Sequence, residues 1–188
     1  SLKEQINPHF LFNTLNNIYG QAIEDNSHST ASSILKLSAM LRHVVHDAQY
    51  PWVSVNKELI YLENYIQLQR QRLGEGVELT YLTKGKFDES LKIAPLILIP
   101  FIENAFKHGI NPDQKSFISI NIDILENKLS LVVKNKKVNI RLQAHEKSGA
   151  GMKITLERLR MLYPKKHELH IDDTADHYLI NLKLELHD

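Results

Sequence analysis

The chain has 188 residues, of which 43% are hydrophobic, so it is long enough to bury the core of one medium domain or two small ones. A formal net charge of +1 argues against a nucleic-acid-binding surface, which requires a clear basic excess. The absence of cysteine excludes disulfides and thiolate metal sites and fits a reducing compartment. No apolar run reaches the roughly 18 residues of a membrane span and no secretory signal opens the chain, so we expect no membrane contact.

The first stretch, residues 2–18, has the apolar spacing of an amphipathic helix. Apolar side chains recur there at spacings of one, three or four residues: Leu2, Ile6, Phe10, Leu11, Leu15 and Ile18. Pro8 is unfavourable in a helix interior because it lacks an amide hydrogen and clashes with the preceding turn. Asn7 would relieve this as the N-cap of a helix that starts at Pro8. From periodicity alone, His9 is a partly buried helix histidine beside a tolerated proline.

A second helix is predicted after a polar break, with Ser29 or Thr30 as its N-cap. Its apolar residues alternate at spacings of three and four, as in a heptad seam that requires a partner helix: Ile34, Leu37, Leu41, Val44 and Ala48. We therefore expect a helical hairpin, about residues 1–50, that pairs with a second copy in a dimeric four-helix bundle. His43 and His46 lie three apart with no third ligand near them, so we interpret them as solvated side chains and not as a metal pair.

The rest of the chain, residues 51–188, mixes helices with strands. Ser54 or Asn56 caps a third helix, and further helices are predicted over residues 95–108 and 152–163. Alternating apolar residues predict strands over 77–81, 118–124, 129–133 and 178–186, the last paired with 168–172. The predicted fold class is α+β, with one antiparallel-rich sheet that has a polar face and a face covered by helices.

A second motif, P-F-I-E-N-A-F-K-H-G, occupies residues 100–109. On a helix, Glu103 and Lys107 are four apart, as are Asn104 and His108, so two polar rows project from one side. An amide oxygen can ligate Mg²⁺, a lysine can meet phosphate charge, and a carboxylate can orient or deprotonate a nucleophile. The same spacing also fits a solvated amphipathic helix with one ion pair.

A third candidate segment begins S-G-A-G-M-K at residue 148. Gly149 and Gly151 stand directly before the predicted helix, where backbone amides and the helix N-terminus favour a phosphate group. A lone G-x-G is as often a flexible turn, so this signal is weaker than the other two.

The segment N-P-H-F-L-F-N, residues 7–13, resembles the phosphoacceptor segment of the LytS-type sensor histidine kinases. The resemblance implies that His9 is the phosphorylated residue. Many histidine kinases place an acidic base directly after the phosphoacceptor, where this chain has Phe10, so we expect the base to come from elsewhere, with Glu103 as the candidate. Asn13, one helical turn after His9, occupies the position at which Thr or Asn supports dephosphorylation of the partner regulator in other kinases.

The segment E-N-A-F-K-H-G resembles the N-box of the GHKL ATPase superfamily in the variant of the LytS-type kinases. It implies a Bergerat-type α/β sandwich in which Asn104 binds the Mg²⁺ of Mg-ATP. The other polar residues of the motif are implied around the phosphates: Glu103, Lys107 and His108. The glycine segment resembles the second glycine box of the family, with Gly149 and Gly151 as the matching residues. The polar segment 136–148 is positioned to be a mobile lid over ATP.

The chain departs from the GHKL pattern where that family carries D-x-G-x-G, whose aspartate accepts a hydrogen bond from the adenine amino group. The corresponding stretch is N-K-K-V-N, with Asn135 in place of the aspartate and no glycine. An asparagine carbonyl is a neutral acceptor, so a contact with adenine remains available without charge assistance. Lys136 and Lys137 are candidates to meet phosphates instead.

Together the motifs predict an ATP-dependent protein-histidine kinase of a two-component system, with a phosphotransfer hairpin at residues 1–50 and an ATP-binding domain at 51–188. His9 would be autophosphorylated from Mg-ATP and would pass the phosphoryl group to an aspartate of a response regulator, for which the resemblance implies the LytTR type. Because the chain begins inside a motif helix, we expect a cytoplasmic fragment of an inner-membrane sensor. A second class of function stays open, a non-catalytic dimeric signalling scaffold with weakened nucleotide binding. A third, an ATPase or kinase acting without His9, leaves residues 7–13 unexplained.

Overall fold

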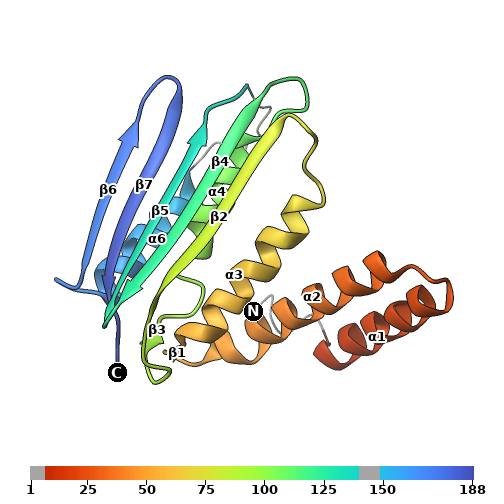
Figure 1. Ribbon diagram of the computed structural model, residues 1–188. Helices are drawn as coiled ribbons and strands as arrows, with labels where there is room; N and C mark the ends of the chain where they lie inside the picture. The colour runs from red at the N-terminus through yellow and green to blue at the C-terminus, as the bar shows by residue number, and fades with distance from the viewer. Residues whose placement is uncertain (1–6, 140–148) are drawn as a thin grey trace.

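The computed structural model describes residues 7–139 and 149–188, which form a helical hairpin beside a layered α/β unit (Figure 1). The hairpin consists of α1 (Pro8–Glu24) and α2 (His28–Val45), followed by the short 3-10 helix η2 (Asp47–Gln49). The described residues of the α/β unit form three helices: α3 (Val55–Arg70), α4 (Ile99–Gly109) and α6 (Ala150–Leu162). Within the described residues, no helix combines the length and the apolar character needed to cross a bilayer.

A five-stranded sheet forms one layer of the α/β unit, in the order β2–β4–β5–β7–β6. Its strands are β2 (Val77–Lys86), β4 (Ser116–Leu125), β5 (Lys128–Lys136), β6 (His167–Asp173) and β7 (His177–Glu185). β2 pairs parallel with β4, and the other neighbouring strands are antiparallel. A separate two-stranded sheet pairs β1 (Val53–Ser54) with β3 (Lys92–Ile93). The α+β class and the antiparallel-rich sheet are therefore confirmed.

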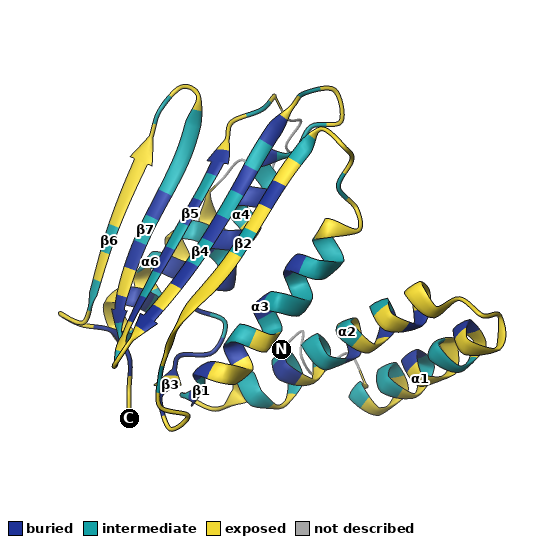
Figure 2. Ribbon diagram, viewed as in Figure 1, coloured by how far each residue is buried: buried dark blue, intermediate teal, exposed yellow. Residues whose placement is uncertain are grey.

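One face of the large sheet carries the core. The alternating isoleucines of β4 are all at most 1% exposed: Ile118, Ile120, Ile122 and Ile124. They share one core with Leu62 of α3, Phe101 of α4 and Leu159 of α6. Each such side chain contributes roughly 1.5–3 kcal/mol when it leaves water. The other face carries polar side chains such as Asp123, so the predicted one-faced sheet is confirmed (Figure 2).

The start of α1 follows the predicted capping. The side chain of Asn7 accepts hydrogen bonds from the amides of His9 at 3.1 Å and Phe10 at 3.4 Å, and Pro8 occupies the first turn. The cap satisfies two of the amides that a helix start leaves unpaired. The hairpin has a small core of its own, formed by Leu15, Ala22, Ala31 and Ile34.

The predicted start of the second helix is wrong by two or three residues. α2 begins at His28, with Ser27 as its N-cap, instead of after Ser29 or Thr30. The Ser27 side chain makes no capping hydrogen bond, so no side-chain signal marks this boundary in the sequence. Along the predicted seam, Leu37 keeps 41% of its surface exposed.

The predicted start of the fourth helix is also wrong. The helix begins at Ile99 and not at Pro95, because Leu96 adopts a left-handed backbone with φ of 57°. Pro100 then lies in the first helical turn, where its missing amide hydrogen costs nothing.

The junction between the hairpin and the α/β unit is packed by Trp52, the single tryptophan of the chain. Its ring meets the ring of Tyr163 at 5.7 Å and that of His187 at 4.7 Å, both in edge-on geometry. Tyr163 is 1% exposed at the end of α6, so the junction is tied to the core of the α/β unit.

Candidate functional site

The second motif lies on α4, which buries one side against the core and turns its polar residues to the other. The buried residues of the helix include Phe101, Ile102, Ala105 and Phe106. Glu103 is exposed, and Asn104, Lys107 and His108 are half-buried. The helix therefore gathers the four predicted motif residues on one polar surface, as the i, i+4 spacing indicates.

Glu103 lies close enough to α3 to act on its tyrosines. Burial, followed by the charge of Glu103, raises the pKa of Tyr61 and of Tyr65 to about 12. The ring of Tyr65 also packs edge-on against Phe106 of α4 at 5.7 Å. Partial desolvation raises the pKa of Glu103 itself, although its side chain keeps exposed surface. A carboxylate of raised pKa is the better proton acceptor, which suits the role predicted for Glu103.

Asn135, near the end of β5, is 1% exposed and carries a buried oxygen that lacks a donor. Its Nδ2 donates to the carbonyl of Lys136 at 3.1 Å, whereas Oδ1 has no partner among the described residues. A Cβ placed on Gly109 would lie 3.1 Å from the Cβ of Asn135, so this side chain adjoins the end of α4. An unpaired buried acceptor costs about 1–3 kcal/mol. It therefore fits a bound group that brings an N–H, such as the adenine amino group implied by the resemblance.

The chain that follows β5 crosses the C-terminal end of α4. The amide of Val138 donates to the carbonyl of His108 at 3.4 Å, and that of Asn139 donates to Gln114 Oε1 at 3.0 Å. The side chain of Asn111 donates to the carbonyl of Asn139. These bonds place the segment that follows Asn135 beside the C-terminal end of α4.

The two lysines predicted as alternative phosphate ligands differ in their surroundings. Lys137 forms an ion pair with Asp173 of β6, whereas Lys136 is exposed at the end of β5. Most of the predicted lid, from residue 140 to 148, lies outside the described residues.

The glycine segment opens α6, with one correction. Gly149 is the N-cap of α6 and has φ of 64°, a conformation that favours glycine. Gly151 lies inside the first turn and not before the helix, and a Cβ there would meet nothing within 4 Å. The first turn of α6 therefore offers the helix N-terminus that favours anions, but only Gly149 has a conformational reason to be glycine.

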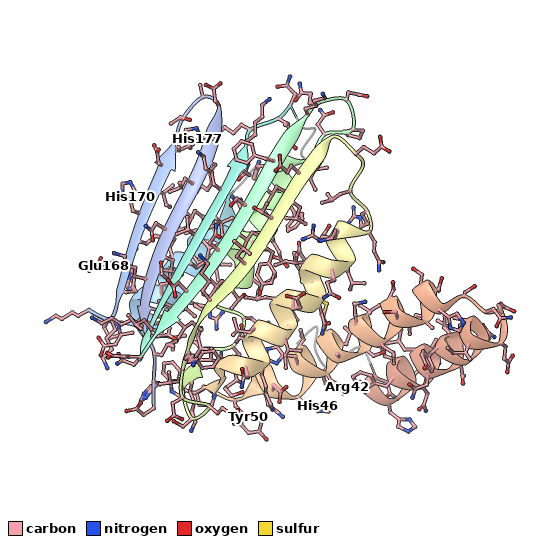
Figure 3. All side chains as sticks on the ribbon, viewed as in Figure 1. Arg42, His46, Tyr50, Glu168, His170 and His177 are labelled. Atoms are coloured by element: carbon pink, nitrogen blue, oxygen red, sulfur yellow. The ribbon has the colours of Figure 1, made fainter. Side chains whose placement is uncertain are left out.

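His9 is exposed in the first turn of α1, with Asn13 one turn further on. Asn13 Nδ2 lies 3.3 Å from His9 Nδ1 and 3.5 Å from Nε2. On α2, the guanidinium of Arg42 lies 5.6 Å from the ring centre of Phe12, and the ring of His46 stacks on Phe12 at 6.2 Å (Figure 3). Arg42 thus adds a cation to the same end of the hairpin, which the motif search did not identify.

The structure does not bring His9 and Glu103 together. α1 packs on α2, and α2 packs on α3, so that these two helices stand between α1 and the α/β layers (Figure 1). His9 and the polar residues of α4 are therefore separate within this conformation of one chain.

His43 is not a solvated side chain, contrary to the sequence prediction. It is 5% exposed, with Nε2 2.6 Å from Glu58 Oε1 and Nδ1 3.2 Å from Asp47 Oδ2. His46 is exposed as predicted. The partner Glu58 lies fifteen residues later on another helix, so helical spacing within α2 gave no signal of it. Among the described residues, no group of three His, Asp or Glu side chains could hold a metal ion.

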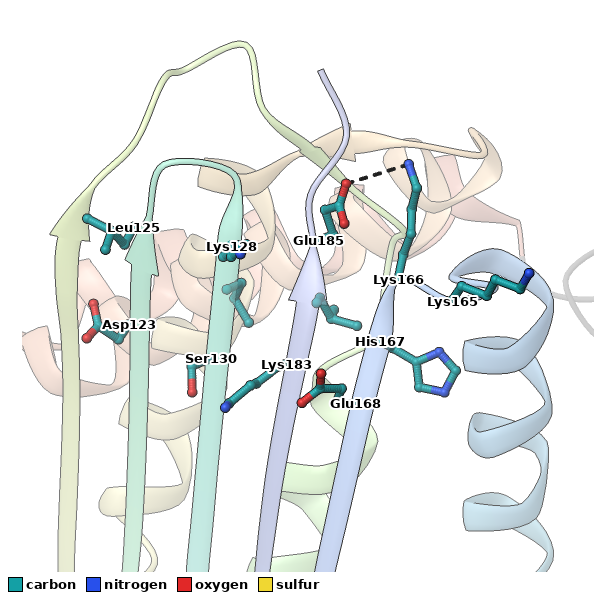
Figure 4. A pocket seen from close by; sticks show the side chains of 12 residues that line it. Asp123, Leu125, Lys128, Ser130, Lys165, Lys166, His167, Glu168, Lys183 and Glu185 are labelled. Carbon is teal, nitrogen blue, oxygen red and sulfur yellow. Dashed lines mark ion pairs between the residues drawn. The ribbon is translucent and has the colours of Figure 1, made fainter.

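A groove lies away from the predicted site, at one end of the sheet (Figure 4). Its volume is about 480 Å³, and its lining includes Asp123, Ser130, Lys183 and Glu168 from four neighbouring strands. It contains none of the predicted site residues, and its lysines and carboxylates partly pair, as Lys166 does with Glu185 at 3.9 Å. The residue chemistry of α4, β5 and α6 therefore identifies the candidate site better than the size of a groove does.

Comparisons with known proteins match the motifs. A family described as histidine kinase matches residues 1–77. Sensor histidine kinase YpdA from Escherichia coli is 30% identical over 87% of this chain and 30% of its own length. Sensor protein LytS from Oceanobacillus iheyensis is 28% identical over 93% of this chain and 32% of its own length. A solved histidine kinase domain from Erythrobacter litoralis aligns over 96% of this chain and 86% of its own, with a TM-score of 0.47 and 12% identity.

The chain spans about a third of the length of the curated relatives that it matches. Sensor protein LytS from Staphylococcus haemolyticus repeats the pattern, with 27% identity over 93% of this chain and 32% of its own length. By these sequence matches, the chain belongs to the LytS-type sensor histidine kinases.

Proposed function

We propose that this chain is the phosphotransfer and ATP-binding core of a two-component sensor kinase. His9 takes the γ-phosphoryl group of Mg-ATP and passes it to an aspartate of a response regulator, of the LytTR type that the resemblance implies. The observation that carries the proposal is an exposed His9 in a capped first turn, contacted by Asn13, in a chain that also presents the ATP motif on α4. The core would be the cytoplasmic part of a membrane-anchored sensor.

The nucleotide residues come from α4, β5 and α6. Mg-ATP, when bound, supplies the phosphoryl group and the cation that offsets its charge. Asn104 would hold Mg²⁺ through its amide oxygen, the kind of donor that this ion prefers. Lys107 and His108 would face the phosphates together with the α6 N-terminus at Gly149 and Gly151. The unpaired Oδ1 of Asn135 would accept from the adenine amino group.

The phosphoacceptor must be neutral to act as a nucleophile. Asn13 Nδ2 can only donate, so its contact with Nδ1 of His9 at 3.3 Å uses the lone pair that a neutral imidazole keeps on one ring nitrogen. Glu103 is the proposed acceptor of the ring proton, since desolvation raises its pKa and Phe10 replaces the usual acidic neighbour. Asn13 is also the proposed residue for dephosphorylation of the regulator.

In a homodimer, His9 of one copy can reach the polar face of α4 in the other copy. Because α2 and α3 stand between His9 and the polar face of α4, His9 reaches that face by movement of the hairpin or from a second copy. Several apolar side chains on the hairpin are exposed: Phe10, Ile18, Ile23, Leu35 and Leu37. A four-helix bundle would remove them from water.

Incubation with Mg²⁺ and γ-labelled ATP tests the proposed reaction. We expect acid-labile, alkali-stable label on the chain and none on the His9→Gln variant. His28→Gln, at an exposed histidine on α2, is the matched control and keeps the label. Label that survives in His9→Gln would contradict the role of His9. Absence of label together with absence of ATP binding by calorimetry would favour the non-catalytic scaffold.

A further inference from the structure

Four charged side chains connect α2 and η2 to α3. Both ring nitrogens of His43 face carboxylate oxygens, Glu58 Oε1 at 2.6 Å and Asp47 Oδ2 at 3.2 Å. Lys57 Nζ lies 2.6 Å from the other oxygen of Asp47. Because carboxylates only accept, both ring nitrogens act as donors, which requires a protonated imidazole. The four groups thus form two acid–base pairs of balanced charge.

Glu58 is the member whose burial is most costly. Its side chain is fully buried, and its Oε1 accepts from His43 and from the amide of Leu96 at 2.9 Å. Its Oε2 is buried without a partner among the described residues. A carboxylate in such surroundings is strongly destabilising unless a cation stays beside it. The buried carboxylate of Glu58 therefore depends on His43 for the cation beside it.

The second donor to Glu58 belongs to the turn that precedes α4. Leu96 has the left-handed φ of 57° noted above, three residues before the helix begins at Ile99. The same turn is held from α6, because Arg158 donates to the carbonyls of Pro95 at 2.9 Å and Leu96 at 3.4 Å. Glu58 and Arg158 thus hold opposite polar groups of one turn, and this turn sets where α4 starts.

We propose that His43 and Glu58 form a coupling pair, through which the position of the hairpin helix α2 is transmitted to the turn that precedes α4. His43 belongs to the hairpin, whereas Glu58 and Leu96 belong to the α/β unit. When α2 leaves α3, Glu58 loses its cation and must be rehydrated, and its bond to the Leu96 amide is weakened. The coupling thus has two states, with α2 docked and undocked.

The inference deepens the proposed function, because its consequence for catalysis rests on α4 carrying the Mg-ATP residues. Neither member of the pair belongs to the candidate nucleotide site, so both are positioning residues. A groove of about 100 Å³ is lined by His43 and, in part, by Ala39, Tyr61 and Asn64, so it lies where α2 meets α3.

Amide hydrogen exchange, followed by mass spectrometry on the whole chain, tests the coupling without any kinase activity. In His43→Ala we expect amide exchange in the peptide that covers residues 94–100 to accelerate about tenfold. This is the change expected when one hydrogen bond to a charged group is lost. The matched control is His28→Ala on the exposed start of the same helix, which leaves that peptide unchanged. Faster exchange in α2 with no change in residues 94–100 would overturn the proposal.

A second variant separates coupling from general loosening. Glu58→Gln keeps an oxygen for the Leu96 amide but no longer needs a cation. In the Glu58→Gln background, we therefore expect His43→Ala to accelerate exchange of residues 94–100 by less than about twofold. The same tenfold effect in both backgrounds would show that the two residues act independently and would overturn the proposal. A failure to label His9 would leave this outcome intact, so the two proposals fail separately.

Discussion

His43 gains its charge from its neighbours in the folded chain. Burial alone would lower its pKa, but hydrogen bonds and charges from Glu58 and Asp47 outweigh burial and raise the pKa above 6.5. A raised folded-state pKa gives stability that is complete below the unfolded-state pKa and is lost as pH rises through the folded-state value. The α2–α3 contact is therefore predicted to weaken towards alkaline pH.

The first prediction concerns this pH dependence. The groups that face His43 are Glu58, Asp47 with its partner Lys57, and the ring of Tyr61 at 5.1 Å, whose own pKa is about 12. Between about pH 6 and pH 9, we expect the thermal midpoint of the chain to fall more steeply than that of His43→Gln. Scanning calorimetry of both proteins measures the difference, and parallel profiles would contradict the assignment of charge to His43.

The second prediction concerns the buried amide of Asn135. Asn135→Asp places a carboxylate where none of the described residues donates to Oδ1, so we expect the free protein to lose about 1–3 kcal/mol of stability. The same charge strengthens a bond from the adenine amino group, so Mg-ATP should raise the thermal midpoint more in the variant than in the natural chain. Melting curves with and without Mg-ATP decide this, and an equal shift in both proteins would argue against adenine at Asn135.

At the scale of elements, local patterns were predictable and tertiary ones were not. The β4–β5 hairpin and the Asn7 cap depend on neighbours in sequence, and both follow the prediction. The start of α4 depends on Leu96, whose left-handed turn is held by Glu58 and by Arg158 of a distant helix. No short stretch of the sequence contains Leu96 together with Glu58 and Arg158. The resemblance to a known family identified the motif residues. The burial of His43 could not be predicted in this way, because it results from the packing of α2 on α3.

The third prediction concerns the exposed seam of the hairpin. Leu37→Glu places a charge on a surface that a second copy would bury, so we expect dimer dissociation to rise by about tenfold or more. Leu125→Glu, at a leucine 72% exposed at the end of β4, is the matched control and leaves association unchanged. Sedimentation equilibrium measures both. Equal dissociation of the two variants would place the dimer contact elsewhere.

At the scale of the whole molecule, the candidate nucleotide residues and His9, the proposed phosphoacceptor, belong to parts with separate cores. α4, β5 and α6 share one core, and α1 packs within the small core of the hairpin. The resemblance indicated which motifs belong together in one reaction. It could not indicate that His9 lies apart from α4 in this conformation, because the angle between hairpin and α/β unit depends on the contact of α2 with α3 and on no local pattern.

The packing of Trp52 at the junction gives the chain a natural optical probe of its own movement. The indole is the only one in the sequence, and its ring meets those of Tyr163 and His187 in the α/β unit. Movement of the hairpin would displace the residues next to Trp52 and change the exposure of the indole to water. Its emission would then follow the motion in real time, and rapid mixing with ATP would reveal whether the motion precedes the proposed phosphoryl transfer or follows it.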